Sequence, residues 1–167
     1  MRQDPNNYWE QLERLEKLIR ASELKAGIIF SFHSLIIGLF IDRIGQFQPV
    51  IQSSKVFVVL SFLWMGCVLV SIFYCFKCFK PQIELKYKKN VFFFRDAVHG
   101  FGDVDAFSKK IMDVCSSEEI YEQLSHQIHI ESKIIDQKFI SVQKSIKFFG
   151  LSFIFVIMAL AFWIITI

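Results

Sequence analysis

The chain has 167 residues, of which 53% are hydrophobic and 16% aromatic, and its mean hydropathy is +0.41. A chain of this length folds around one modest core, which cannot bury so much apolar surface, so part of that surface must face lipid. The formal net charge of +3 is too small to indicate a nucleic-acid partner. Composition therefore favours a membrane protein and argues against an ordinary soluble domain.

Three stretches without a charged residue are the candidate membrane spans: 26–41, 56–76 and 148–167. The second and third are long enough to cross about 30 Å of hydrocarbon as helices. The first is shorter than the roughly 20 residues that a span needs, so we expect Lys25 to snorkel and 44–47 to extend it. A signal peptide is the alternative for this first stretch, but acidic residues precede it and no small-residue cleavage site follows.

The positions of Lys and Arg predict the orientation of these spans, because cytoplasmic segments beside a span carry an excess of positive charge. Basic residues are frequent before the first span and after the second, and sparse in the loop 42–55. We therefore expect a transmembrane hairpin at 26–76, with the N-terminus and residues 77–115 in the cytoplasm. The basic residues are Arg2, Arg14, Lys17, Arg20 and Lys25 before the hairpin, Arg43 and Lys55 within it, and Lys77, Lys80, Lys86, Lys88, Lys89 and Arg95 after it.

Residues 1–25 are predicted to form an amphipathic cytoplasmic helix that runs unbroken into the first span. Acids and bases stand one turn apart in the favourable order, as in Glu13 and Lys17, while Leu12, Leu15 and Ile19 share the opposite face. That apolar face is typical of packing within the protein, and a self-association face is the alternative.

Residues 116–167 are predicted to form one long helix, cytoplasmic over 116–147 and membrane-spanning over 148–167. Ser116 and Glu119 have the spacing of a capping box, and no proline interrupts the following residues. Apolar residues recur at threes, fours and sevens as far as Ile146, which predicts an apolar stripe. We expect this stripe to join the subunits of a homo-oligomer through Leu124, Ile128, Ile135 and Phe139.

The central segment 77–115 is the least regular part of the sequence. Its aromatic run at 91–94 is compatible with a strand or with the apolar plug of a small cytoplasmic domain. Gly100 and Gly102 indicate a turn, and Asp103 is a candidate cap for a short helix over 106–114.

Polar side chains inside the first span are unusual, because each needs a partner in lipid. Ser31, His33 and Ser34 predict either a hydrogen-bonded helix interface or a pore-lining, gating position. No catalytic constellation accompanies them, so we expect neither enzymatic activity nor a cofactor. His126 and His129 have no third ligand of matching placement, and Cys75 and Cys78 lack the strand and turn of a redox pair, so no metal or redox site is predicted.

The order of these elements resembles the Pycsar transmembrane effector family, with a further relation to SLATT-type effectors. The resemblance covers nearly the whole chain and rests on three motifs. These are the acid-x-Lys-Ala motif at 23–26 that leads into the first span, the aromatic run before Asp96, and the pair Lys138-Phe139 in the long helix before the last span. It implies an all-α membrane protein with three transmembrane helices and a small, mainly helical cytoplasmic domain.

The resemblance also implies a function in antiphage defence. A partner cyclase makes a cyclic pyrimidine nucleotide, cUMP or cCMP, and the effector oligomerises in the bacterial inner membrane and impairs it before phage matures. This chain shows no appended cyclic-nucleotide-binding domain, so the candidate ligand-binding residues are the cations Lys86, Lys88, Lys89 and Arg95 among aromatic rings. The alternatives are that these cations meet lipid headgroups, and that the protein is a scaffolding or channel-type membrane protein without a nucleotide trigger.

Overall fold

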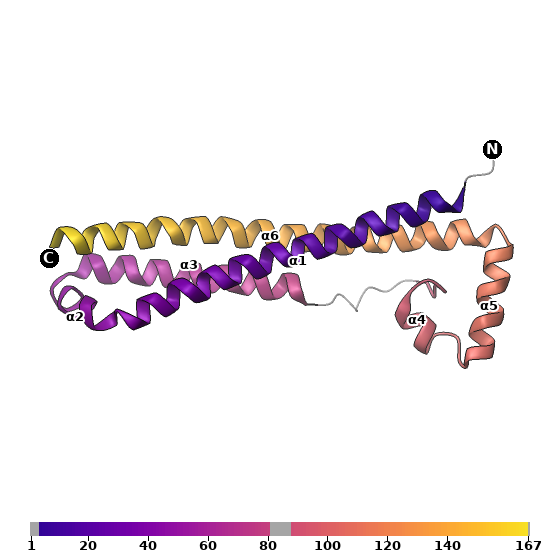
Figure 1. Cartoon of the computed structure of the whole chain (residues 1–167), viewed down its shortest axis with the longest axis horizontal. Coiled ribbons are helices and arrows are strands. Elements are labelled where there is room, and N and C mark those ends of the chain that lie inside the picture. Colours follow the sequence, from indigo (N-terminus) through magenta and orange to yellow (C-terminus); the bar gives the residue numbers. More distant parts are fainter. Residues whose placement is uncertain (1–3, 81–87, 167) are drawn as a thin grey trace. The chain divides into compact units, whose positions relative to one another are not determined.

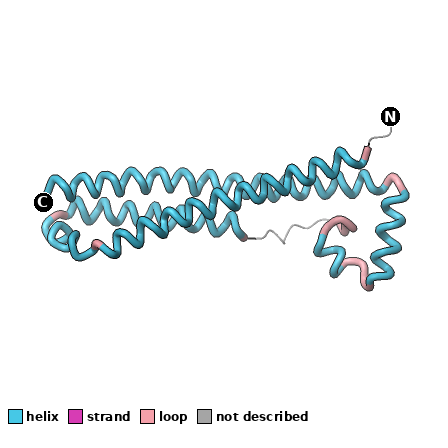
Figure 2. The backbone as a smooth tube through the Cα atoms, viewed as in Figure 1, coloured by secondary structure: helices cyan, strands magenta, loops and turns pink. Residues whose placement is uncertain are grey.

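The computed structural model describes residues 4–80 and 88–166 (Figure 1), and within those ranges the chain forms helices and no strand (Figure 2). Three helices are long and apolar enough to cross a membrane: α1 (Pro5–Asp42), α3 (Lys55–Phe79) and α6 (Glu119–Thr166). The predicted all-α membrane fold is confirmed, including the unbroken passage from the N-terminal helix into the first span and the single C-terminal helix.

The chain divides into two compact units. The membrane unit consists of Ala21–Lys80 and Gln137–Ile167, and the polar unit consists of Met1–Arg20 and Pro81–Asp136. Both α1 and α6 contribute residues to each unit, so the unit boundaries lie within helices. The boundaries that the sequence predicts at 25 and 147 follow hydropathy, which marks contact with lipid rather than packing between helices, and they stay predictions.

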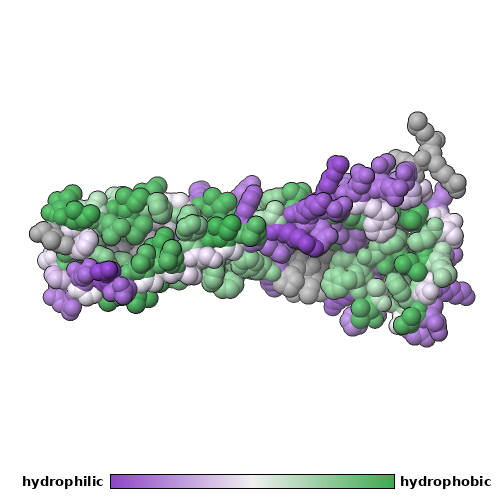
Figure 3. All heavy atoms as spheres, viewed as in Figure 1, coloured by the Kyte–Doolittle hydropathy of each residue, from purple (hydrophilic) through white to green (hydrophobic). Residues whose placement is uncertain are grey.

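The membrane unit buries serines between its helices and exposes many large apolar residues, although Trp64 and Phe57 also lie in its core. Its buried residues include the serines at 71, 141, 145 and 152, whereas Phe62 is 75% exposed and Phe73 is 63% exposed. The surface of this unit in Figure 3 is accordingly mostly apolar. Such packing is favourable in lipid, where apolar contact with hydrocarbon stabilises the outside and close approach stabilises the inside.

The segment 42–55 has a structure that the sequence did not predict. Instead of a plain loop, Ile44–Ser53 is a short helix, α2, whose Phe47 and Val50 are buried with Phe57 of α3 and Ala159 of α6. The Ser54 hydroxyl accepts a hydrogen bond from the Phe57 N–H at 3.4 Å and caps α3. The apolar residues of α2 therefore close one end of the membrane unit's core.

The polar unit is held together around Asn90, which is 1% exposed. Its amide Nδ2 donates to the Gln123 carbonyl of α6 at 2.7 Å, and its backbone N–H donates to Asp96 Oδ2 at 2.9 Å. The Val91 N–H donates to Gln123 Oε1 at 2.9 Å. A strand over 91–94 is therefore wrong: these backbone groups bond to side chains, and α4 (Phe94–His99) begins within the run.

Two helix starts in the polar unit test the capping predictions. Asp103 caps α5 (Val104–Ser116), since its Oδ1 accepts from the Ala106 N–H at 2.8 Å, and Gly102 before it has a φ of +86° that favours glycine. The predicted cap at Ser116 is wrong. Ser116 ends α5, and the hydroxyl that accepts from the Glu119 N–H, at 3.2 Å, belongs to Ser117.

Candidate functional site: the helix junction of the membrane unit

An ion pair between a buried lysine and a partly exposed glutamate joins α1 and α6 within the membrane unit. Lys138 is 4% exposed, and its Nζ donates to Glu23 Oε1 at 2.7 Å and to the Cys78 carbonyl at 2.6 Å. Cys78 lies in the last turn of α3, whose carbonyls have no partner within the helix and attract a cation. One ammonium group thus connects all three long helices.

Two of the sequence motifs that suggested a family meet at this junction. Glu23 and Ala26 lie one turn apart on the same face of α1, and Ala26 is fully buried against Cys75 and Cys78. The small side chain of Ala26 allows α1 to approach α3, and Glu23 supplies the carboxylate for Lys138. The spacing of the motif is therefore explained by one side chain that packs and one that neutralises a charge.

About two helical turns along the bundle from the ion pair, α3 and α6 are in close contact through hydroxyl groups. Ser71 Oγ donates to the Ser145 carbonyl at 3.0 Å, and Ser145 Oγ donates to the Ser71 carbonyl at 3.1 Å. Cys75 Sγ lies 3.0 Å from Ser145 Oγ. Both serines are fully buried, so this contact leaves no space for water between the two helices. Sequence reasoning missed it, although serines inside apolar runs are a signal of such contacts.

The three polar residues predicted at the first span do not form one face. His33 is 1% exposed, its ring lies edge-on to Phe149 at 5.1 Å between centroids, and its Nε2 has no hydrogen-bond partner among the described residues. Ser31 and Ser34 are exposed, and their hydroxyls donate to carbonyls of α1 itself, those of Gly27 and Phe30. Of the three, His33 alone is a buried polar group of the bundle.

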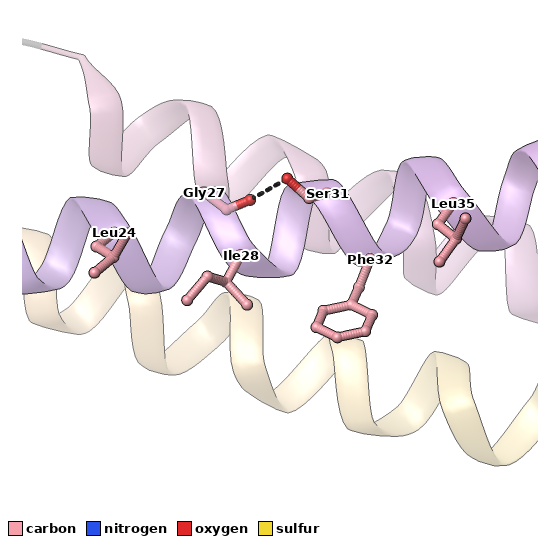
Figure 4. Close-up of a pocket in the computed structure, with 6 residues that line it drawn as sticks. All are labelled: Leu24, Gly27, Ile28, Ser31, Phe32 and Leu35. Atoms are coloured by element: carbon pink, nitrogen blue, oxygen red, sulfur yellow. Dashed lines mark hydrogen bonds between the residues drawn. The ribbon is translucent and has the colours of Figure 1, made fainter.

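Ser31 instead lines a shallow groove on the outer face of α1. Figure 4 shows its hydroxyl bonded to the Gly27 carbonyl, with Ile28 and Phe32 projecting from the same helix. Leu24 and Leu35 complete the groove. Because nearly all of the exposed lining is apolar, this face is suited to lipid acyl chains or to another apolar helix.

The hydrogen bonds and ion pairs given for the described residues do not bring the predicted ligand-binding cations together at one site. Lys86 lies outside those residues. Lys88 and Arg95 are exposed, and Lys89 Nζ donates to the Gly100 carbonyl at 2.8 Å. Lys89 therefore contributes to the fold of the segment that precedes α5, and its role toward a ligand stays a prediction.

The residues predicted to join subunits are largely inside the protomer. Leu124 is fully buried and Ile135 is 6% exposed, while Ile128 and Phe139 are half-buried. The apolar stripe of α6 thus contributes to packing within one chain. Its role between subunits stays a prediction, and the exposed Ile140 and Ile146 are the α6 residues near the junction that remain available to a second copy.

The polar unit also contains a half-buried acid, Glu131 on α6. Burial raises the pKa of its carboxyl, a hydrogen bond from Gln127 Nε2 at 2.9 Å lowers it in part, and the negative charge of Glu16 raises it further. A raised pKa in the folded state means that folding favours the protonated acid. The stabilisation is fully present below the ordinary pKa of 4.5 and is lost as the pH rises through the higher folded value.

We expect the backbone amides of the polar unit to exchange more slowly in the Glu131→Gln variant than in the native chain at neutral pH. In acid the two should exchange at equal rates. The amide keeps the shape of the carboxyl and removes the cost of its ionisation. Hydrogen exchange of the polar unit between about pH 4 and 8 measures the difference. The matched control is Glu10→Gln, since Glu10 is exposed. A constant difference between Glu131→Gln and the native chain over this range would contradict the linkage.

The fold and the junction together define a class: an all-α membrane protein whose three long apolar helices are tied by a buried lysine. A family model described as the Pycsar effector protein domain, PycTM, matches residues 7–165. The chain therefore belongs to the Pycsar effector family. The same comparisons found no matching curated protein and no matching solved structure.

Membership of this family identifies the protein as an antiphage defence effector with transmembrane character. The family is one of membrane effectors rather than of catalysts. The conclusion agrees with the packing of the membrane unit, where the chemistry present is helix association in lipid.

Proposed function

We propose that this protein oligomerises in the bacterial inner membrane and impairs the membrane when a partner cyclase makes a cyclic pyrimidine nucleotide, cUMP or cCMP. The observation that carries the proposal is the match of the effector family model over 7–165, joined to a bundle that buries several serines and Lys138 and exposes many large apolar residues. The same family membership supports a cyclic nucleotide as the signal.

Any aqueous path requires more than one subunit. The interior of the membrane unit is closed by the contact of Ser71 with Ser145 and by the buried Lys138, so one protomer leaves no channel along its axis. Water or ions would pass between subunits, or through lipid that the assembly disturbs. The proposal therefore includes a homo-oligomer.

The signal reaches the membrane through α1 and α6, since each helix contributes to both units. A change in the polar unit acts on two helices that are joined near their middles by Glu23 and Lys138. Because Lys138 contacts all three long helices at the junction, a rotation or shift of one helix against another there would change the packing of all three spans. The distribution of Lys and Arg supports an N-terminus in the cytoplasm, where a cyclase product would accumulate.

Co-expression with a pyrimidine cyclase tests the function. We expect loss of membrane potential and entry of an impermeant dye within minutes of cyclase induction, and neither when a catalytically dead cyclase is induced. A scaffold without a nucleotide trigger would leave cells polarised in both cases, and that result would contradict the proposal.

Replacing His33 by leucine in this assay separates a gating histidine, whose loss abolishes dye entry, from a packing histidine, whose loss does not.

Charge placed on the exposed apolar face of α6 tests the oligomer. We expect Ile140→Asp to reduce the mass of the detergent-solubilised complex, because a carboxylate is costly to bury between subunits. Ser125→Asp adds the same charge at an exposed polar position of the same helix, about four turns away from Ile140, and should leave the mass unchanged. Equal masses for the native chain and both variants would exclude this face as the subunit contact.

A further inference from the structure

The polar unit contains a cavity of about 470 Å³ between the first turns of α1, the aromatic run at 92–94 and α6. Its size lies in the range of small-molecule sites, which is about 300–1,000 Å³. Trp9 of α1 and Phe92 line it, and their rings meet edge-to-face at 5.2 Å between centroids. Flat, apolar walls of this kind are surfaces on which an aromatic ligand stacks.

Polar groups of α6 form another wall. Gln127 is 5% exposed, its Nε2 donates to Glu131 Oε1 at 2.9 Å, and its Oε1 has no hydrogen-bond partner among the described residues. A buried carbonyl oxygen without a partner is costly, and a ligand N–H would satisfy it. Glu131 beside it accepts a hydrogen bond when ionised and donates one when protonated.

The charges of the cavity restrict what can enter. Glu13 and Glu16 of α1 line it together with Glu131, so an anionic group inside would meet three carboxylates. Along the chain, Lys88 precedes the aromatic run and Arg95 follows it, and both are exposed. The inside of the cavity is thus suited to an uncharged ring that carries N–H groups and ring-nitrogen or carbonyl acceptors. The cations outside it are suited to a phosphate group.

We propose that this cavity binds the base of a nucleotide, which stacks on the ring of Trp9 with Phe92 edge-on to it and bonds through its edge to Gln127 and Glu131, while its phosphate stays outside near Lys88 and Arg95. The inference rests on the proposed function for the identity of the nucleotide. The edge of a pyrimidine carries a donor beside an acceptor, and the amide and carboxyl groups of Gln127 and Glu131 offer the complementary pair.

A bound base would contact α1 through Trp9 and α6 through Gln127, so it would stabilise one arrangement of these two helices over others. The same two helices carry Glu23 and Lys138 at the junction. A base bound in the polar unit would therefore contact both of the helices that continue into the membrane unit.

Calorimetry with the full chain in detergent tests the site, using cCMP, cUMP, cAMP and cGMP as probes. We expect the native chain to bind a pyrimidine nucleotide, and Gln127→Leu and Trp9→Leu each to weaken binding about tenfold or more. Trp9 is 44% exposed, so its replacement disturbs packing little if Gln127→Leu proves unstable. Gln143→Leu, an exposed glutamine on the same helix outside the cavity, should bind like the native chain.

The outcomes separate the site from the function. Native binding with unchanged affinity in both cavity variants would overturn the site and leave the proposed function standing. Failure of the native chain to bind any of the four probes would also overturn the site. In that case the co-expression assay decides the function separately, since dye entry on cyclase induction does not depend on where or how the nucleotide acts.

Discussion

Replacing Glu23 by alanine should destabilise the membrane unit by about 3 kcal/mol, because the buried Lys138 ammonium then keeps its hydrogen bond to the Cys78 carbonyl but loses its counter-charge. Removing one partner of a buried pair costs far more than the pair itself contributes, since the remaining charge stays desolvated. Unfolding in mixed detergent micelles, followed by far-ultraviolet circular dichroism, measures the loss.

A second variant distinguishes charge from packing at the junction. The double replacement Glu23→Gln with Lys138→Met keeps the side-chain volumes and removes both charges, so most of the lost stability should return. The control for a simple loss of an ion pair is Glu16→Ala, whose partner Arg20 is exposed, and we expect a cost of about 0.3–0.5 kcal/mol. Equal losses of unfolding free energy for Glu23→Ala and Glu16→Ala would show that the Lys138 charge is not desolvated at the junction.

Replacing Ser145 by leucine should separate α3 from α6 and destabilise the bundle by about 1–3 kcal/mol. The Ser145 hydroxyl lies 3.1 Å from the Ser71 hydroxyl and 3.0 Å from Cys75 Sγ, so a branched four-carbon side chain has no room without movement of the helix backbones. Removing only the hydroxyl, in Ser145→Ala, should cost about 0.6 kcal/mol, the average for a hydrogen bond between membrane helices.

Ser34→Leu is the matched control for this overpacking, because it makes the same replacement at an exposed position of α1. We expect it to leave the unfolding transition nearly unchanged, since a leucine there faces lipid. If Ser145→Leu were tolerated as well as Ser34→Leu, the close contact of α3 with α6 would be wrong. Permeability measured on the same variants then relates bundle stability to effector activity.

Local sequence features account for the correct predictions. The apolar runs 26–41, 56–76 and 148–167 determined the spans, because lipid accepts few unpaired charges over that length. The unbroken periodicity and the absence of proline after residue 116 predicted the single helix α6. Asp103 was predictable as a cap because it stands just before an apolar-periodic segment, next to a glycine turn.

Local errors arose where neighbouring residues compete for one role. Ser116 and Ser117 are both good caps, and the backbone turn between α5 and α6 selects the second. The aromatic run at 91–94 has strand propensity, but Asn90 and Gln123 bond its backbone instead. The hairpin loop became α2 because Phe47 and Val50 gain burial against α3 and α6.

Composition, period and motif are local features of the chain, and they are enough to predict the lipid-facing segments, the helical class and the family. The packed fold is needed to show that Glu23 meets Lys138, 115 positions away, and that His33 points inward while Ser31 and Ser34 point outward. It also brought Trp9, Phe92 and Gln127 around one cavity. The reason is that helix rotation and pairing are set by packing between distant segments, and hydropathy along one helix does not encode which partner its polar residues face.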